Sequence, residues 1–458
     1  MLRLHDTATG EVRPLELRDE GRVSMYVCGP TVYDLPHLGH GRFTLVFDVL
    51  RRHLIASGLD VTYVSNITDI DDKIIEKAAA EGRSEAEVAA EFEDEWWQAM
   101  DRLNVLRPDE IPHATAFVDG MVNTIAELLA AGVAYATSDG VYLDTSAVEG
   151  YGLLAGQPLD SLRAGARVEG NDEKRSPLDF ALWKSAKPGE PVWPAPFGEG
   201  RPGWHTECVV MSLDLLGEGF DLHGGGLDLK FPHHENERAQ AVALGRPFAR
   251  HWAHNGWVMV EGEKMSKSLG NFTSLTDLLA KADGRAYRLL VLRSHYRAPI
   301  EVTAETIGDA ERGLARLDAL ARRMGLRSPE APVVLVGDAA LDGPSVERFL
   351  TLMDDDLQTP QALGLVFELV GDANSALDAG DAERAAVLGA TVVALSAAMG
   401  LGVDGEADEI DADTRALAAE RDAARAARDF ARSDEIRDQL QAAGWVVEDT
   451  ADGTALRR

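Results

Sequence analysis

Residues 22–65 read RVSMYVCGPTVYDLPHLGHGRFTLVFDVLRRHLIASGLDVTYVS, and they carry the signals of three successive elements. The apolar run at 22–28 predicts a buried strand, the apolar spacing over 39–56 predicts a helix, and 60–65 predicts a second strand. A strand–helix–strand unit favours a parallel sheet with a nucleotide crevice at the carboxyl ends of its strands.

The later chain continues this alternation around an interruption. The stretch 145–203 is rich in Gly, Pro and charge and predicts an insertion into the sheet domain, whereas the chain from about residue 300 is almost wholly helical. Further predicted elements are helices at 86–100, 114–131, 205–216 and 232–244, a hairpin with an Asp-Gly turn at 134–144, and a strand at 219–223. The predicted fold class is α/β: a Rossmann-type parallel-sheet domain split by an insertion and followed by α-helical C-terminal domains.

Composition limits the function classes. A chain of 458 residues predicts about three domains of roughly 150 residues each. Its 77 acidic residues against 45 Lys and Arg give a net charge of -32, which argues against non-specific nucleic-acid binding but not against a local basic stripe. Two cysteines do not make a disulfide framework, and no apolar run approaches the ~20 residues of a membrane span. We therefore expect a soluble, cytoplasmic protein.

Two short motifs point to phosphate chemistry. The sequence PHLGH (36–40) lies between the first strand and its helix, where a helix N-terminus offers N–H groups to phosphate and Gly39 permits close approach. The sequence KMSKS (264–268) places two lysines in a loop, where they can neutralise charge that develops on a triphosphate. Taken singly, helix capping explains the first motif and a solvated basic loop explains the second. Their occurrence together, in this order, is harder to attribute to chance.

A third set of residues has the composition of a zinc site. Cys28 and Cys208 are the only cysteines, and His233 and Glu237 lie four residues apart, so that they share one face of a predicted helix. Two thiolates, one imidazole and one carboxylate suit zinc. His234 and Glu235 lie between these two residues in sequence, and we expect their side chains to point to other faces of the helix. The alternative is a buried apolar Cys208 and a capping His233.

The C-terminal residues carry an arginine pattern. Arg421, Arg425, Arg428 and Arg432 fall at i, i+4, i+7 and i+11, on one face of a helix predicted to begin near residue 413, and Trp445 follows. Arginines bind phosphate, and an exposed Trp stacks on unpaired bases, so these residues are candidates for RNA contact. The alternative is a helix whose arginines form salt bridges with neighbouring acidic residues, and a Trp445 that packs in a hydrophobic core.

Longer motifs resemble one family. The PHLGH and KMSKS sequences are similar to the His-Ile-Gly-His and Lys-Met-Ser-Lys-Ser signatures of class I aminoacyl-tRNA synthetases. Nearly the whole chain, its C-terminal helical region included, resembles cysteinyl-tRNA synthetase. The motifs that carry this resemblance are CGPTVYD (28–34), NITDIDDK (66–73), GWHTEC (203–208), HGGG (223–226) and FPHHENE (231–237).

The resemblance implies ATP-dependent ligation of L-cysteine to cysteine tRNA through a cysteinyl-adenylate. It implies one zinc ion per subunit, held by Cys28, Cys208, His233 and Glu237 and binding the substrate sulfur, and a magnesium ion that accompanies ATP. A zinc ion would separate cysteine from serine, where a plain pocket discriminates such pairs by only about 10²-fold. Four protein ligands ordinarily mark a closed site, so the implied role requires a fifth coordination position or a loose Glu237.

The resemblance also implies roles for individual residues. The catalytic residues are His37, His40, Lys264 and Lys267. ATP is bound by His37, Gly39, His40, Gly224, Gly225, Asp228 and Lys267. The substrate cysteine is bound by Gly29, Thr31, Thr68, Trp204 and His223. The tRNA is contacted by Arg421, Arg425, Arg428, Arg432 and Trp445. For Asp69, Asp71 and Asp72, helix capping and local salt bridges are the preferred interpretation over a magnesium site.

The family also implies a monomer with a particular division of the chain. Residues 1–134 and 204–260 form the two halves of the catalytic domain, the second with the zinc site, and 135–203 form a connective insertion. Residues 261–327 hold the KMSKS loop and a stem-contact region, 328–401 a helical bundle, and 402–458 a small anticodon-binding domain.

Three rival functions are weighed against this one. A mycothiol-pathway cysteine ligase resembles this family but transfers activated cysteine to an amino sugar; the order of residues 28–33 and the C-terminal arginines argue against it. A non-enzymatic RNA-binding or regulatory paralogue is disfavoured by the intact KMSKS sequence and the pair His37 and His40. A zinc-stabilised scaffold protein explains neither of these motifs.

Overall fold

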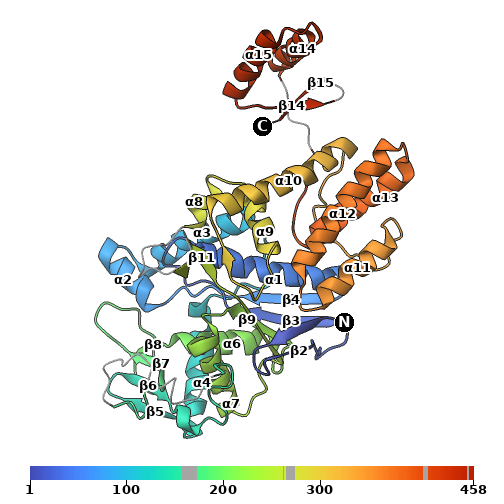
Figure 1. Cartoon of the computed structure of the whole chain (residues 1–458). Helices are drawn as coiled ribbons and strands as arrows, with labels where there is room; N and C mark the ends of the chain where they lie inside the picture. Colours follow the sequence, from blue (N-terminus) through green and yellow to red (C-terminus); the bar gives the residue numbers. More distant parts are fainter. Residues whose placement is uncertain (157–172, 261–262, 265–273, 406–410, 451–452, 458) are drawn as a thin grey trace. The chain divides into compact units, whose positions relative to one another are not determined.

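The structure is a computed structural model that describes residues 1–156, 173–260, 263–264, 274–405, 411–450 and 453–457. Its central sheet consists of β3 (Arg22–Val27), β4 (Asp60–Ser65), β9 (Leu222–Gly226) and β10 (His251–Asn255). The strand order is β10-β9-β3-β4, and every neighbouring pair is parallel. Helix α1 (Leu38–Ala56) covers one face of this sheet and α6 (Trp204–Leu216) the other (Figure 1). The predicted strand–helix–strand unit and the parallel sheet are confirmed.

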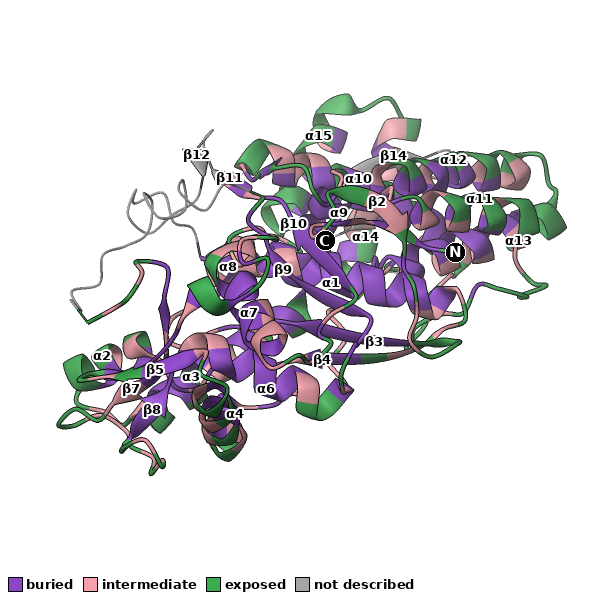
Figure 2. Cartoon of the chain, turned by 90° about the horizontal axis from the view of Figure 1, so that it is seen from below, coloured by how far each residue is buried: buried purple, intermediate pink, exposed green. Residues whose placement is uncertain are grey.

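Strands β3, β9 and β10 are largely buried, as Figure 2 shows, whereas the edge strand β4 is only partly buried. Strand β9 lies later than predicted, because a turn with positive φ at Gly217 and Gly219 occupies the start of the predicted range 219–223. The strand that follows contains three glycines, which are poor strand formers. Side chains elsewhere fill the space that a Cβ would need: a Cβ at Gly224 would lie 2.3 Å from the ring of Phe47.

An antiparallel sheet interrupts the central one in sequence. It consists of β5 (Ala134–Thr137), β6 (Gly140–Leu143), β7 (Phe180–Ser185) and β8 (Gly200–Pro202), in that order. The first two strands form the predicted hairpin, with Asp139 and Gly140 at its turn. The sheet packs into a buried cluster that includes Trp183 and Leu182 together with Val118, Ile125 and Ala239 from outside the insertion. The insertion therefore interrupts the parallel sheet in sequence and shares a core with neighbouring helices.

The remaining elements of this region surround the central sheet. The strands β1 (Arg3–Asp6) and β2 (Glu11–Pro14) pair with each other. The helices are α2 (Asp72–Glu81), α3 (Glu85–Arg102), α4 (Val118–Ala130) and α7 (Glu235–Ala243), with 3₁₀ turns at Ala114–Phe117 and Thr145–Ala147 and a π-helical turn at Lys230–His234. The helix predicted at 232–244 therefore begins with a wider turn than a regular α-helix.

The chain beyond the sheet is mainly helical. A three-stranded sheet is formed by β11 (Val258–Val260), β12 (Glu263–Lys264) and β13 (Ile300–Glu301). The helices are α8 (Leu275–Leu279), α9 (Gly284–Leu292), α10 (Ala304–Met324), α11 (Gly343–Asp354), α12 (Thr359–Asp378) and α13 (Ala382–Ala398). Within the described ranges, none of the helices combines the length and apolarity that crossing a bilayer requires. Two compact units result, one of residues 1–316 with 328–402 and one of residues 317–327 with 403–458.

The second unit corrects the prediction of one arginine-lined helix. Helix α14 (Ala412–Ala426) ends before Arg428, whose φ is +62°, and α15 (Phe430–Ala442) begins anew. Arg428, with its positive φ, follows the end of the first helix, and Asp429 starts the second, because its side chain accepts a hydrogen bond from the backbone of Arg432 at the N-terminus of α15. The four arginines therefore do not lie on one helix face.

Trp445 is also placed differently from the expectation of an exposed ring. It is 3% exposed and packs with Ile436 and Leu440, before the terminal hairpin of β14 (Val446–Thr450) and β15 (Gly453–Arg457). Arg421 is likewise buried and donates to Thr454 Oγ1. The core interpretation of Trp445 is correct, and the stacking interpretation is wrong.

A buried ion triad joins helices distant in sequence. Asp48 of α1 accepts hydrogen bonds from Arg52, at 2.8 Å, and from Arg288 of α9, at 2.7 Å. Burial alone would raise the pKa of Asp48, but the two guanidinium groups outweigh it and hold the pKa below its usual value. Burial lowers the pKa of Arg288 to about 10, so this guanidinium remains charged at neutral pH. The triad fixes α9 against α1.

Replacement of Asp48→Asn leaves two buried arginines without their anion. We expect the free energy of unfolding to fall by about 3–5 kcal/mol at pH 7, measured by urea unfolding followed by tryptophan fluorescence. Because the folded pKa of Asp48 is depressed, its contribution is present above about pH 4 and is lost below it, so the two proteins should converge in acid. Asp101→Asn, at an exposed pair with Arg107, should change stability by less than about 1 kcal/mol. Equal stability of the wild type and the Asp48 variant at pH 7 would contradict this account.

Candidate active site and metal centre

A cavity of about 450 Å³ opens at the carboxyl ends of the central strands. Parallel sheets place ligands at this edge, where the loop after each strand contributes side chains. Predicted site residues that line this one cavity are Cys28, Gly29, Thr31, His37, Gly39, His40, Trp204 and Asp228. Its volume is within the range of small-molecule sites, and its residues come from both halves of the interrupted domain.

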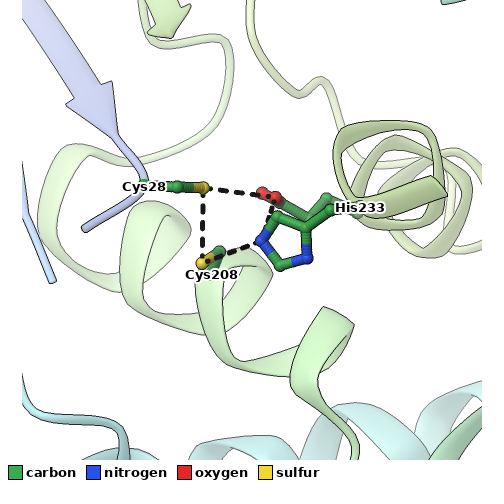
Figure 3. Close-up of side chains that lie close together, drawn as sticks. Cys28, Cys208 and His233 are labelled. Carbon is green, nitrogen blue, oxygen red and sulfur yellow. Dashed lines mark hydrogen bonds and ion pairs between the residues drawn. The ribbon is translucent and has the colours of Figure 1, made fainter. Parts of the chain in front are cut away.

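Cys28 lines this cavity, and the three other predicted metal ligands meet it in a buried cluster (Figure 3 labels Cys28, Cys208 and His233). Cys28 follows β3, Cys208 lies on α6, His233 lies in the π-helical turn, and Glu237 lies on α7. Their ligand atoms all lie within 4.8 Å of one another, and all four residues are buried. Segments separated by up to 209 residues in the chain thus meet in one cluster.

The separations match those of a tetrahedral metal site. The Sγ atoms of Cys28 and Cys208 are 3.5 Å apart, Cys208 Sγ lies 3.6 Å from His233 Nε2, and Cys28 Sγ lies 3.4 Å from Glu237 Oε1. Metal–ligand bonds of ordinary length around zinc place such atoms roughly 3.5–3.8 Å apart. His233 Nε2 and Glu237 Oε1, at 3.0 Å, are slightly closer than this. The cluster can hold a metal ion with small adjustments.

Electrostatics also favours a cation in this cluster. Burial raises the pKa of the Cys28 thiol well above its usual value, and the neighbouring Cys208 and Glu237 raise it further. Burial raises the pKa of the Cys208 thiol as well. A bound cation lowers the pKa of both thiols, because it stabilises the thiolates and the carboxylate together.

A second set of side chains orients the ligands. His205 Nδ1 lies 2.9 Å from His233 Nδ1, so that His233 Nε2 faces the cluster. The ring of Trp204 stacks on that of His233 at 4.0 Å, and Trp204 also lines the cavity. His223 Nε2 lies 2.7 Å from Glu237 Oε2, so His223 supports a ligand from behind. Such contacts hold ligands in position in known metal sites.

The π-helical turn changes one expectation about α7. His234 was expected to point away from the ligands, but it is fully buried and lies in a second possible ligand group with Cys28, His223 and Glu237. The chain is kinked at Phe231, whose φ of -144° and ψ of 132° are not helical, and His234 Nδ1 lies 2.8 Å from His254 Nε2. Residue spacing assumes a regular helix and therefore misplaced this side chain.

Two histidines form the N-terminus of α1 beside the cavity. His37 Nδ1 accepts a hydrogen bond from the backbone N–H of His40, and His40 Nδ1 accepts one from that of His37, at 3.1 and 3.2 Å. The two rings stack at 3.6 Å. Because each Nδ1 is an acceptor, each imidazole carries its proton on Nε2. The pair can therefore present N–H donors to an anionic ligand at a helix N-terminus.

Other predicted site residues lie behind the cavity wall or outside the described residues. Thr68 is buried, and Gly224 and Gly225 lie within β9, where they pack against Phe47 and His234. The backbone of Lys264 lies in β12, paired with β11. Lys267 lies outside the residues that the structure describes.

The three aspartates of residues 69–72 serve structure. Asp69 accepts from Thr115, Asp71 caps the N-terminus of α2, and Asp72 pairs with Lys184 and Arg201 of the insertion. The preferred interpretation of capping and salt bridges is confirmed. Asp72 also links the motif at 66–73 to the antiparallel sheet.

Sequence reasoning missed several residues of the cavity wall. They are Tyr33, Phe43, Lys73, Asn255 and Trp257. Lys73 lies in a quoted motif, and its ammonium stands 4.9 Å from the centre of the Tyr33 ring. In the sequence, the only signal for Lys73 as a site residue was its place near the end of that motif. A single aromatic residue carries no such signal.

Comparison with known proteins identifies the family. Residues 14–312 match the model for the tRNA synthetases class I (C) catalytic domain, and residues 348–404 match the DALR domain. The chain is 47% identical to the cysteine--tRNA ligase of Chromobacterium violaceum and 44% identical to that of Halorhodospira halophila, in each case over 100% of both chains. It is also 44% identical to that of Brevibacillus brevis, over 100% of this chain and 99% of the relative.

Solved structures agree on the fold. Methionyl-tRNA synthetase of Mycobacterium tuberculosis in complex with methionyl-adenylate matches with a TM-score of 0.58 and 19% identity, over 82% of this chain and 89% of that one. A putative arginyl-tRNA synthetase of Campylobacter jejuni matches with a TM-score of 0.53 and 13% identity, over 86% and 95%. The chain belongs to the cysteine--tRNA ligase family, and its predicted fold class is confirmed.

The metal cluster predicts a change in metal content on substitution of one ligand. The purified protein should contain about one divalent ion per chain, and Cys208→Ser should lose it, because a neutral hydroxyl is a poor ligand for a soft metal site. Inductively coupled plasma mass spectrometry measures the content. Ser212→Ala, one turn further along α6, should retain the ion. Full metal content in the Cys208 variant would remove that thiol from the ligand set.

Proposed function

We propose that this member of the cysteine--tRNA ligase family joins L-cysteine to cysteine tRNA in two steps. The carboxylate of cysteine attacks the α-phosphorus of ATP, forming cysteinyl-adenylate and releasing pyrophosphate. A hydroxyl of the terminal tRNA ribose then attacks the activated carbonyl carbon, forming the ester and releasing AMP. The observation that carries this proposal is a cavity whose wall contains the His37 and His40 pair and also Cys28, a member of the buried thiol–imidazole–carboxylate cluster.

The phosphate end of the cavity supports the first step by electrostatics. The Nε2–H groups of His37 and His40 would donate to phosphate oxygens, and Gly39 would allow the backbone of α1 to approach them. Lys264 and Lys267 would neutralise the charge that develops during displacement. Asp228 would accept from ribose hydroxyls, with Gly224 and Gly225 beneath the nucleotide. No protein nucleophile is required, since positioning and charge stabilisation suffice.

The metal end of the cavity supports selection of the amino acid. We assign zinc to Cys28, Cys208, His233 and Glu237, because two thiols and an imidazole form a soft donor set. When bound, zinc would favour the thiolate of cysteine over the hydroxyl of serine. Glu237 Oε2 lies 2.7 Å from His223 Nε2, so this carboxylate would keep a partner if it yields its position to the substrate. Gly29, Thr31, Thr68 and Trp204 would enclose the rest of the amino acid.

The remaining partners follow from the family. Magnesium accompanies ATP, and the protein acts as a cytoplasmic monomer. The second compact unit would contact tRNA, with Arg425 and Arg428 as the better candidates. Arg432 forms ion pairs with Glu420 and Glu435, and Arg421 and Trp445 are buried. The six-part division of the chain given above is retained as a proposal.

The test of this function is transfer of radiolabelled cysteine. The purified protein is incubated with ATP and magnesium, once with cysteine tRNA and once with the amino-sugar acceptor of the mycothiol ligases. Label on the tRNA alone is the expected result. Label on the amino sugar alone would assign the chain to the ligase branch, and label on neither would refute the catalytic proposal.

The lysine assignment makes a separate prediction. Lys267→Ala should reduce adenylate formation by about 10²-fold or more, which is typical for loss of one preorganised electrostatic donor. Cysteine-dependent exchange of pyrophosphate into ATP measures this rate. Lys281→Ala, at an exposed lysine after α8, serves as the matched control and should retain the wild-type rate. A near wild-type rate in the Lys267 variant would exclude Lys267 from the catalytic residues.

A further inference from the structure

Asn66 lies immediately after β4 and is 1% exposed. Its Oδ1 accepts a hydrogen bond of 2.9 Å from the backbone N–H of Gly29 and one of 3.1 Å from the hydroxyl of Tyr26. A backbone N–H can only donate, so this contact fixes Oδ1 on the side of Gly29. The Nδ2 of Asn66 therefore faces Thr68 and donates to its Oγ1 at 3.2 Å.

The network continues with a defined direction. Thr68 Oγ1 accepts from Asn66 and donates to Glu207 Oε2, 3.1 Å away. Thr68 is 1% exposed and Glu207 is 1% exposed, so water does not compete for these contacts. The hydroxyl of Thr68 thus has one orientation, and Asn66 determines it. Buried polar networks of this kind hold side chains in a single arrangement when every member has a partner.

The backbone shows why the amide of Asn66 is needed at this place. Beyond the sheet, the segments after β3 and β4 remain paired, since Thr68 N–H donates to Pro30 O and Val32 N–H donates to Thr68 O. The two segments are so close that a Cβ at Gly29 would lie 1.7 Å from the carbonyl oxygen of Asn66. Gly29 follows the metal ligand Cys28 and lines the cavity. The Asn66 side chain therefore bridges the metal-ligand segment and the Thr68 segment.

We propose that Asn66 is a positioning residue that sets the amino-acid end of the cavity, by holding the Cys28–Gly29 backbone and orienting the Thr68 hydroxyl together. This inference rests on the proposed function, because it assigns the affected ligand as cysteine. Asn66 acts on the cysteine site through Gly29 and Thr68, so its loss should weaken cysteine binding and leave ATP binding intact. Its Oδ1 also lies 3.8 Å from Cys208 Sγ, so the metal content is measured together with the KM values.

The test uses Asn66→Asp, which keeps the size of the side chain and its acceptor for Gly29 but replaces the donor to Thr68. Cysteine-dependent pyrophosphate exchange gives KM for cysteine and for ATP. We expect KM for cysteine to rise about tenfold, as loss of one buried hydrogen bond implies, with an unchanged KM for ATP and about one metal ion per chain. Asn374→Asp, whose amide donates to Val370 O within α12, is the matched control.

A double-mutant cycle separates positioning from general damage. Thr68→Val should raise KM for cysteine, and Asn66→Asp should add little in the Thr68→Val background, because its effect passes through that hydroxyl. Fully additive effects, an equal rise in both KM values, or an unchanged KM for cysteine would each overturn the proposal. If Asn66→Asp does not fold, Thr68→Val alone decides, since an unchanged KM for cysteine in that variant refutes the network. An inactive wild-type protein would instead refute the proposed function.

Discussion

Two thiols and a carboxylate lie out of water within a few ångströms of one another, and only a cation lets them ionise together. Most of the catalytic unit is arranged around this constraint. Cys28 follows strand β3, and Cys208 lies on α6. His233 lies in the turn that leads into α7, and Glu237 lies on α7 itself. The insertion lies between these segments in the chain and leaves the parallel sheet intact.

The opposite end of the cavity depends on α1. Its N-terminus carries His37 and His40, and its middle carries Asp48, which anchors α9 through Arg288. Helix α9 follows the lysine-rich segment in sequence, and Tyr287 of α9 also donates to the Leu38 carbonyl at the start of α1. Buried contacts thus hold α9, the helix that follows the lysines in sequence, to α1, whose N-terminus we propose as the phosphate site. This arrangement fits chemistry that relies on preorganised charges.

The sequence predicted those features that local patterns encode. Apolar periodicity located β3, α1 and β4, and the spacing of His233 and Glu237 predicted that both reach one ligand cluster. The failures involve information that spacing does not contain. A kink at Phe231 precedes the buried His234, a helix-capping Asp429 divided the arginine pattern, and glycines entered β9 because Phe47 and His234 fill the space beside them. The role of Asn66 was not visible in its motif, since its partner Gly29 lies 37 residues away in the chain.

The order of the ligands along the chain has a consequence for biosynthesis. Cys28 emerges from the ribosome early, but its partner thiol follows 180 residues later, and Glu237 later still. During that interval the other ligands of the cluster are absent and the sheet is incomplete, because β9 and β10 have not yet been made. A reducing compartment protects such a thiol. Once closed around a cation, the cluster would join segments that span about half of the chain, and a cation that binds only the folded state stabilises that state.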